Sequence, residues 1–162
     1  MSGSNWPLMK DSITWADKFR LISFLTRTSS YTQNKKVRDF EEKWSEWLGA
    51  KRSLFVSSGS TANFLLVDAV MYKYGLKPGD KVLLPACTWM TNVAPPIQLG
   101  MTPVFCDINL GDFSFCEEKL KSMATEHPDI KMIFVTHLLG FPVNHSRLRK
   151  FWPTALILDD VC

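Results

Sequence analysis

The sequence lacks the features that mark membrane proteins, secreted proteins and common metal sites. No uncharged apolar run reaches the roughly 18 residues that a membrane-spanning helix needs, so we expect no membrane contact. Residues 1–18 are polar and lack the apolar core of a signal peptide, which predicts a cytoplasmic protein. The 4 cysteines form no CxxC pair, which disfavours a zinc site or a redox motif, and we expect reduced thiols.

The sequence also lacks an excess of charge of one sign. Its 19 Lys and Arg residues are interspersed with 16 Asp and Glu residues, and the net charge is +3 with His neutral. Proteins that bind nucleic acids typically cluster their basic residues, so we expect no nucleic-acid partner. Apolar residues are plentiful, at 46% of 162 residues, and this proportion is typical of a globular domain with a sizeable core.

Apolar patterning divides the chain at about residue 33. Residues 1–33 are predicted to form an N-terminal segment with a helix at about 15–25 and a polar loop. The later predicted helices cover residues 35–48, 61–74, 92–99 and 116–124, and the predicted strands cover residues 53–57, 81–85, 103–106, 131–136 and 155–158. Because these strands are apolar throughout, residues 34–162 are predicted to form a three-layer α/β/α domain around a mostly parallel sheet.

Three polar segments follow predicted strands, at the edge where parallel sheets bind ligands. The first, residues 57–63, begins a helix, whose free backbone N–H groups and positive dipole end suit a phosphate group. Gly59 allows close approach to the backbone, and Ser60 and Thr61 add hydroxyl groups. The alternative is an ordinary helix cap without a ligand, because Ser and Thr are common cap residues.

The other two segments supply an aromatic ring and a pair of carboxylates. Trp89 follows the strand at 81–85, where it can cover a flat heteroaromatic ring or serve as a core or interface residue. Asp159 and Asp160 close the last predicted strand, where one carboxylate can hold a ring nitrogen protonated or cap a helix. We expect no metal site, because no partner ligand has a recognisable spacing.

A phosphate cradle, an aromatic lid and a carboxylate at a ring nitrogen are together what pyridoxal phosphate requires, because a protonated ring accepts electrons. At these residues the sequence resembles the DegT/DnrJ/EryC1/StrS family of sugar aminotransferases, pyridoxal phosphate enzymes of fold type I. The resemblance runs from about Tyr31 to Cys162. It rests on residues 37–41, 57–63, 77–82, 85–89, 100–108, 137–142 and 158–162.

The resemblance implies a role for each candidate site residue. The implied cofactor-binding residues are Gly59, Ser60, Thr61, Trp89 and Asp160. The first three would bind the cofactor phosphate, the tryptophan would stack on the pyridine ring, and Asp160 would pair with the ring nitrogen as the one catalytic residue. The cofactor would be pyridoxal 5′-phosphate or pyridoxamine 5′-phosphate.

Two neighbouring residues are expected to lie outside the cofactor site. Asp159 is predicted to face the opposite side of the sheet from Asp160, because adjacent side chains on a strand alternate. His137 lies in a stretch similar to the family, and we expect a structural role for it.

The chain departs from the family at its end. Family members form an internal Schiff base through a Lys that follows the acidic pair, and this Lys is absent because the sequence ends two residues after Asp160. We therefore expect the N-terminal part of the fold type I large domain, incomplete, and we expect the 162-residue chain by itself to be inactive.

Three alternative functions are predicted, and the resemblance implies the first two. The first is an aminotransferase in amino or deoxy sugar or surface polysaccharide biosynthesis, acting on a nucleotide-linked keto sugar with an amino acid as donor. The second is a nucleotide-sugar 3-dehydratase of the same family, in which a His replaces the Lys and pyridoxamine phosphate works without a Schiff base to the protein. The third is a non-catalytic remnant that binds the cofactor or a partner. The full-length form is implied to be a homodimer.

Overall fold

The computed structural model describes residues 12–32 and 34–161. The chain divides into two compact units between Phe55 and Val56. The domain boundary predicted at residue 33 rests on the sequence pattern alone, and it stays a prediction. No helix among the described residues is both long and apolar enough to cross a membrane.

The first unit contains two helices with well-defined ends. Helix α1 is Trp15–Arg27, and it begins at a capping box in which Thr14 and Asp17 each accept the other's backbone N–H. The hydrogen bonds from Thr14 hold the pKa of Asp17 below its ordinary value. Helix α2 is Lys35–Leu48, as predicted, and it ends at Gly49, which has the left-handed φ of 71° that glycine adopts readily.

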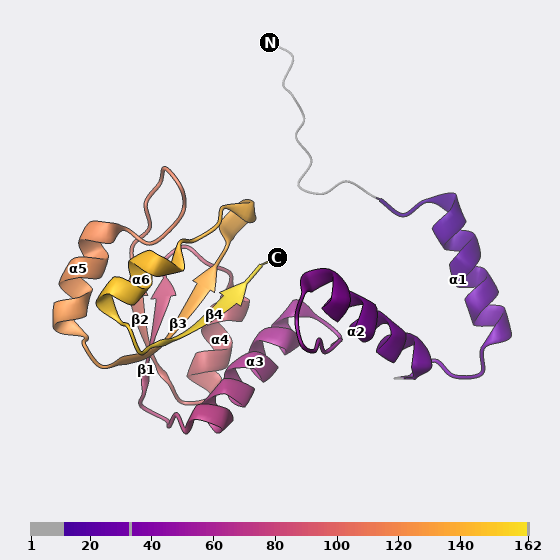
Figure 1. Ribbon diagram of the computed structural model, residues 1–162, viewed down its shortest axis with the longest axis horizontal. Helices are drawn as coiled ribbons and strands as arrows, with labels where there is room; N and C mark the ends of the chain where they lie inside the picture. Colours follow the sequence, from indigo (N-terminus) through magenta and orange to yellow (C-terminus); the bar gives the residue numbers. More distant parts are fainter. Residues whose placement is uncertain (1–11, 33, 162) are drawn as a thin grey trace, which may run out of the picture. The chain divides into compact units, whose positions relative to one another are not determined.

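The second unit alternates helices with four strands. Its strands are β1 Lys81–Pro85, β2 Thr102–Cys106, β3 Ile130–Thr136 and β4 Leu156–Asp160, and its helices are α3 Gly59–Tyr74, α4 Met90–Gln98, α5 Glu117–Glu126, the 3₁₀ turn η1 Leu138–Gly140 and α6 His145–Phe151 (Figure 1). The strands pair in the order β2-β1-β3-β4, and every pairing is parallel. All four carboxyl ends therefore lie at one edge of the sheet.

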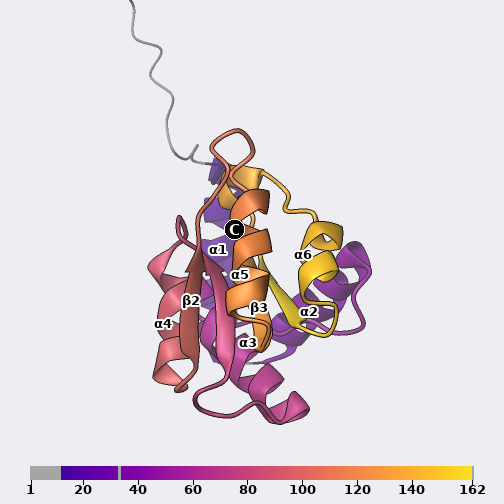
Figure 2. The same cartoon turned by 90° about the vertical axis from the view of Figure 1, so that its left-hand side faces the viewer.

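Helices cover both faces of this sheet, as Figures 1 and 2 show. On one face, α3 and α4 pack against strand residues such as Val82 and Phe134. On the other face, α5 and α6 pack against residues such as Leu83 and Ile133. Neighbouring residues of a strand thus belong to opposite cores, which is why the strand sequences are apolar throughout. The predicted three-layer α/β/α fold is confirmed.

Burial has a chemical consequence at the end of β2. Cys106 is fully buried, and desolvation, followed by the nearby Cys116, raises the pKa of its thiol to about 12. The thiol therefore stays protonated and unreactive at neutral pH. The three described cysteines, Cys87, Cys106 and Cys116, form no disulfide with one another.

Two sequence predictions about local structure are wrong. Residues 53–57 form no strand: the segment takes part in none of the described strand pairings, and Leu54 is 72% exposed. Helix α4 begins at Met90 rather than at residue 92, so Pro95 and Pro96 lie inside the helix and not in its first turn. The fully buried Pro96 and half-buried neighbours such as Val93 keep this segment packed on the sheet.

Candidate functional site

The first turn of α3 presents backbone donors at the carboxyl edge of the sheet. Ser58 caps the helix, and its Oγ accepts the N–H of Thr61 at 3.2 Å. The N–H groups of Gly59 and Ser60 precede the first helical hydrogen bond and have no partner among the described residues. These two groups are therefore the donors that α3 offers to an anion, and the N–H of Thr61, which was predicted to share that role, is engaged by the cap.

Gly59 has no structural need to be glycine. Its φ lies outside the left-handed range, and a Cβ added to it would meet no atom within 4 Å. Gly75, at the other end of α3, has a φ of 69°, so glycine is needed there for the backbone. The open space beside Gly59 is thus the feature that a bound group would use.

Trp89 stands at the start of the next helix along the edge. It is the N-cap residue of α4, and it is 68% exposed. Among the described residues its ring makes no aromatic contact. It is therefore not a core residue of the second unit. The adjoining Thr88 hydroxyl is tied to that of Thr136, at the end of β3, by a hydrogen bond of 2.6 Å.

Asn63 joins the elements that carry the predicted site residues. Its side-chain amide donates to Asp160 Oδ2 at 2.9 Å and to the carbonyl oxygen of Thr91 at 3.3 Å. Asn63 lies one turn after Ser60, Thr91 lies two residues after Trp89, and Asp160 ends β4. These contacts bring the starts of α3 and α4 and the end of β4 to one place.

The carbonyl that Asn63 contacts is available because of a proline. Residue Pro95 lies four positions after Thr91 and has no N–H, so Thr91 lacks the usual helical donor. The amide of Asn63 occupies that position instead. Sequence reasoning did not select Asn63 as a site residue, because it placed Pro95 in the first turn of the helix, where a missing N–H leaves no helical carbonyl unpaired.

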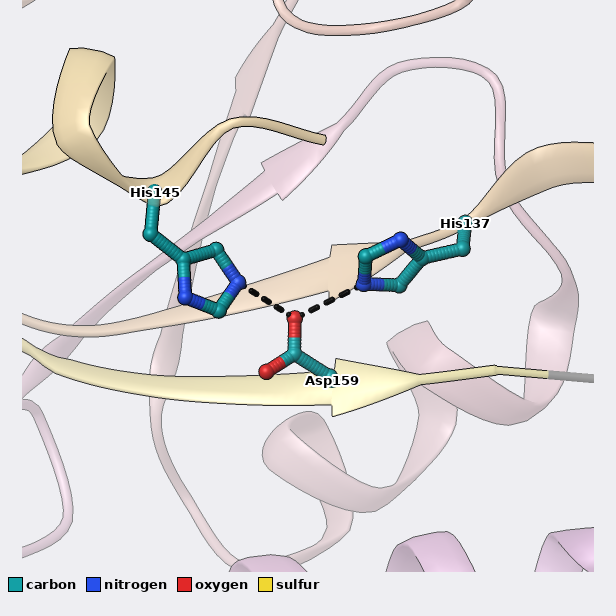
Figure 3. A group of neighbouring side chains, drawn as sticks. All are labelled: His137, His145 and Asp159. Carbon is teal, nitrogen blue, oxygen red and sulfur yellow. Dashed lines mark hydrogen bonds and ion pairs between the residues drawn. The ribbon is translucent and has the colours of Figure 1, made fainter. Parts of the chain in front are cut away.

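On the other face of β4, Asp159 is held by two histidines (Figure 3). Its Oδ1 accepts from His137 Nε2 at 2.9 Å and from His145 Nε2 at 2.7 Å. His137 follows β3, and His145 begins α6. The predicted opposite orientation of Asp159 and Asp160 is confirmed, since Asp160 contacts α3 on the first face. His137 has the expected structural contacts, with a side chain only 15% exposed.

The side chains of Asp159 and the two histidines are close enough to share a metal ion, since their ligand atoms lie within 4.8 Å of one another. The hydrogen bonds indicate that N–H groups of the histidines, and not a metal ion, face Asp159. The Nδ1 atom of His137 accepts the N–H of Val143 at 3.3 Å, so in the neutral ring Nε2 carries the hydrogen and donates it to Asp159. A metal-binding histidine typically donates from its other nitrogen, which this contact does not allow.

The sequence matches one protein family along most of its length. The DegT/DnrJ/EryC1/StrS aminotransferase family matches residues 15–155. This chain belongs to that family. The match includes the starts of α3 and α4, which meet at Asn63, and it ends at residue 155, directly before β4 and its acidic pair.

Curated members of the DegT/DnrJ/EryC1/StrS family are similar over nearly the whole chain. The GDP-4-keto-6-deoxy-D-mannose 3-dehydratase of Yersinia pseudotuberculosis is 35% identical, with 98% of this chain and 40% of that protein covered. The enzyme of the same name from Escherichia coli O55:H7 is 32% identical, with 98% and 41% covered. This family member thus spans about two fifths of the length of these relatives.

A solved structure of a family member agrees with the fold. The E. coli GDP-4-keto-6-deoxy-D-mannose 3-dehydratase, determined with bound hydrated pyridoxal phosphate, has a TM-score of 0.87 and 31% sequence identity. The alignment covers 98% of this chain and 41% of that one. The α/β/α layers therefore correspond to part of a fold type I pyridoxal phosphate enzyme.

Proposed function

We propose that residues 56–161 form the cofactor-binding part of a 3-dehydratase that acts on a nucleotide-linked 4-keto-6-deoxy sugar. The proposal is supported by relatives bearing that activity in their names, at 32% and 35% identity over nearly the whole chain. The observation that carries it is that Asn63 joins the start of α3, the start of α4 that carries Trp89, and the Asp160 carboxylate at the end of β4. The cofactor is pyridoxamine or pyridoxal 5′-phosphate.

Each residue has a defined task in this proposal. The N–H groups of Gly59 and Ser60, at the positive end of α3, bind the phosphate. Trp89 covers one face of the pyridine ring and excludes water from it. Asp160 accepts the hydrogen of the ring nitrogen and keeps that nitrogen protonated through a charge-assisted bond. The bound cofactor supplies an electron-accepting ring.

The second candidate is transfer of an amino group from an amino acid to the same class of keto sugar, and the family's description as aminotransferases favours it. By the resemblance, the choice between the two activities depends on a Lys or a His after the acidic pair, beyond Cys162.

Incubating the whole protein with GDP-4-keto-6-deoxymannose, pyridoxamine phosphate and glutamate distinguishes the two activities. A dehydratase gives a deoxygenated sugar, an aminotransferase gives an amino sugar, and a non-catalytic remnant gives neither. A homodimer is our expectation for the full-length form.

Paired glycine substitutions on α3 test the cofactor site. Gly59→Ala is expected to weaken pyridoxamine phosphate binding about tenfold, because a methyl group would fill the space that the phosphate needs and disturb charge-assisted hydrogen bonds. Its melting temperature should not fall, since the backbone and the surroundings accept a Cβ. Titration monitored by tryptophan fluorescence measures the affinity, and calorimetry measures the melting temperature.

Gly75→Ala is the matched control on the same helix. Alanine is strained at a φ of 69°, so the melting temperature should fall by an amount equivalent to about 1 kcal/mol. The affinity of the folded molecules should stay unchanged. If wild-type protein does not bind the cofactor, or if Gly59→Ala binds it as tightly as wild type, the proposed site is wrong.

A further inference from the structure

We propose that Asn63 is a positioning residue for Asp160, and that it holds the carboxylate in the orientation in which Oδ1 meets the ring nitrogen of the cofactor. This inference rests on the proposed function. It goes beyond it by giving a role to a side chain that touches neither the phosphate nor the ring.

The two amide hydrogens of Asn63 are both committed. One is donated to Asp160 Oδ2 at 2.9 Å and the other to the carbonyl oxygen of Thr91 at 3.3 Å. Both partners are acceptors, so the NH₂ group, and not the amide oxygen, must face them. The residue is only 7% exposed, which removes water as an alternative partner. Turning the amide would break both hydrogen bonds at once.

The Asp160 carboxylate depends on this single side chain. Asn63 provides its one hydrogen bond from a side chain among the described residues, and that bond uses Oδ2. The backbone carbonyl of Asp160 is held separately by the N–H of His137 at 3.0 Å. With the backbone and Oδ2 both fixed, Oδ1 is the acceptor left for the ring N–H.

A neutral amide is a suitable donor for orienting the Asp160 carboxylate. A carboxylate that keeps a pyridine nitrogen protonated must retain its negative charge. A Lys or Arg at position 63 would orient the carboxylate but would also compete with the pyridinium for it. The neutral amide of Asn63 orients the carboxylate without adding a charge.

The ¹⁵N chemical shift of the ring nitrogen tests the proposal, because it reports the protonation of that nitrogen directly. The protein is titrated with ¹⁵N-labelled pyridoxamine phosphate, and the shift is followed against pH. In wild type the bound ring is expected to stay protonated well above the pKa of the free ring nitrogen. In Asp160→Asn the bound ring should be neutral. Leucine has a similar size to asparagine and no hydrogen-bond donor. In Asn63→Leu the pKa of the bound ring nitrogen should therefore lie between the values for wild type and Asp160→Asn, and the dissociation constant of pyridoxamine phosphate should rise about fivefold.

Two further variants separate positioning from folding. Val67→Ala removes a fully buried core contact one turn further along α3, so it should lower the melting temperature and leave the ¹⁵N titration unchanged. Asn63→Ser keeps a small polar group that cannot reach Asp160, and should reproduce the ¹⁵N effect if Asn63→Leu does not fold.

The outcomes distinguish this inference from the proposed function. If wild-type protein fails to bind pyridoxamine phosphate, the proposed function is wrong. If wild type binds and Asp160→Asn changes the ¹⁵N titration, but Asn63→Leu and Asn63→Ser match wild type, the positioning role alone is wrong.

Discussion

Residues at the carboxyl edge of the sheet are of two kinds: some are buried and hydrogen-bonded, and others are exposed to solvent. Asn63 and Thr136 are buried and paired, whereas Trp89 is mostly exposed and makes no aromatic contact among the described residues. An exposed indole at the start of a helix contributes little to the stability of the second unit. A role for this indole in covering the cofactor ring stays a prediction.

Replacing Trp89 therefore separates binding from stability. Trp89→Ala is expected to weaken the binding of pyridoxamine phosphate by about 1 kcal/mol or more, because the ring loses its stacking surface. The melting temperature should change little, since the side chain is 68% exposed. Isothermal titration calorimetry measures the affinity. An unchanged dissociation constant would mean that the indole serves a protein contact instead.

At the scale of elements, β4 connects the two faces of the sheet. Asp160 is bonded to α3 on one face, and Asp159 is bonded on the other to His137, which follows β3, and to His145 of α6. The strand end is thus held on both faces by side chains that come from different elements. This arrangement fixes the position of the candidate site relative to the helices around it.

Removing the carboxylate of Asp159 should loosen the end of β4. Asp159→Leu leaves the N–H of the mostly buried His137 without an acceptor, which is expected to cost about 1–3 kcal/mol. Urea denaturation measures the loss. Asp129→Leu is the control, because Asp129 is more than half exposed in its pair with Lys81, and its loss should be smaller. Equal losses for both variants would show that the histidine contacts add nothing.

At the scale of the whole molecule, exposed carboxylates make stability depend on pH. Hydrogen bonds from Ser114 lower the pKa of Asp112 below its ordinary value, and the side-chain hydrogen bond from Lys81 lowers the pKa of Asp129 in the same way. A carboxylate with a lowered folded-state pKa stabilises the folded state above its unfolded-state pKa. That contribution is lost as the pH falls through the folded-state value.

We therefore expect the free energy of unfolding to decrease as the pH is lowered below about 4. Urea denaturation at several pH values between neutral and strongly acidic measures this decrease. Ser114→Ala removes the hydrogen bond from the Ser114 hydroxyl to Asp112, keeps the one from the backbone N–H, and should make the decrease smaller. Stability that stays constant through this acidic range would contradict the assignment.

Local patterns predicted most of the elements because the relevant physics acts over a few residues. The bounds of α2 follow from one apolar helical face and from Gly49, whose left-handed conformation ends the helix. The opposite orientation of Asp159 and Asp160 follows from the two-residue period of a strand. The start of α4 could not be predicted in this way, since the donor that replaces the missing N–H of Pro95 is Asn63, which lies 28 positions from Thr91 in the sequence.

The sequence by itself determined the alternation of helices and apolar strands, the family, and the segments that carry the candidate site. Only the tertiary structure decided that residues 53–57 form no strand and that Asn63 bonds to Asp160, 97 positions away. A strand needs a neighbouring strand, and a buried amide needs acceptors. Both depend on which distant segments the fold brings side by side, and periodicity within one segment carries no information about that.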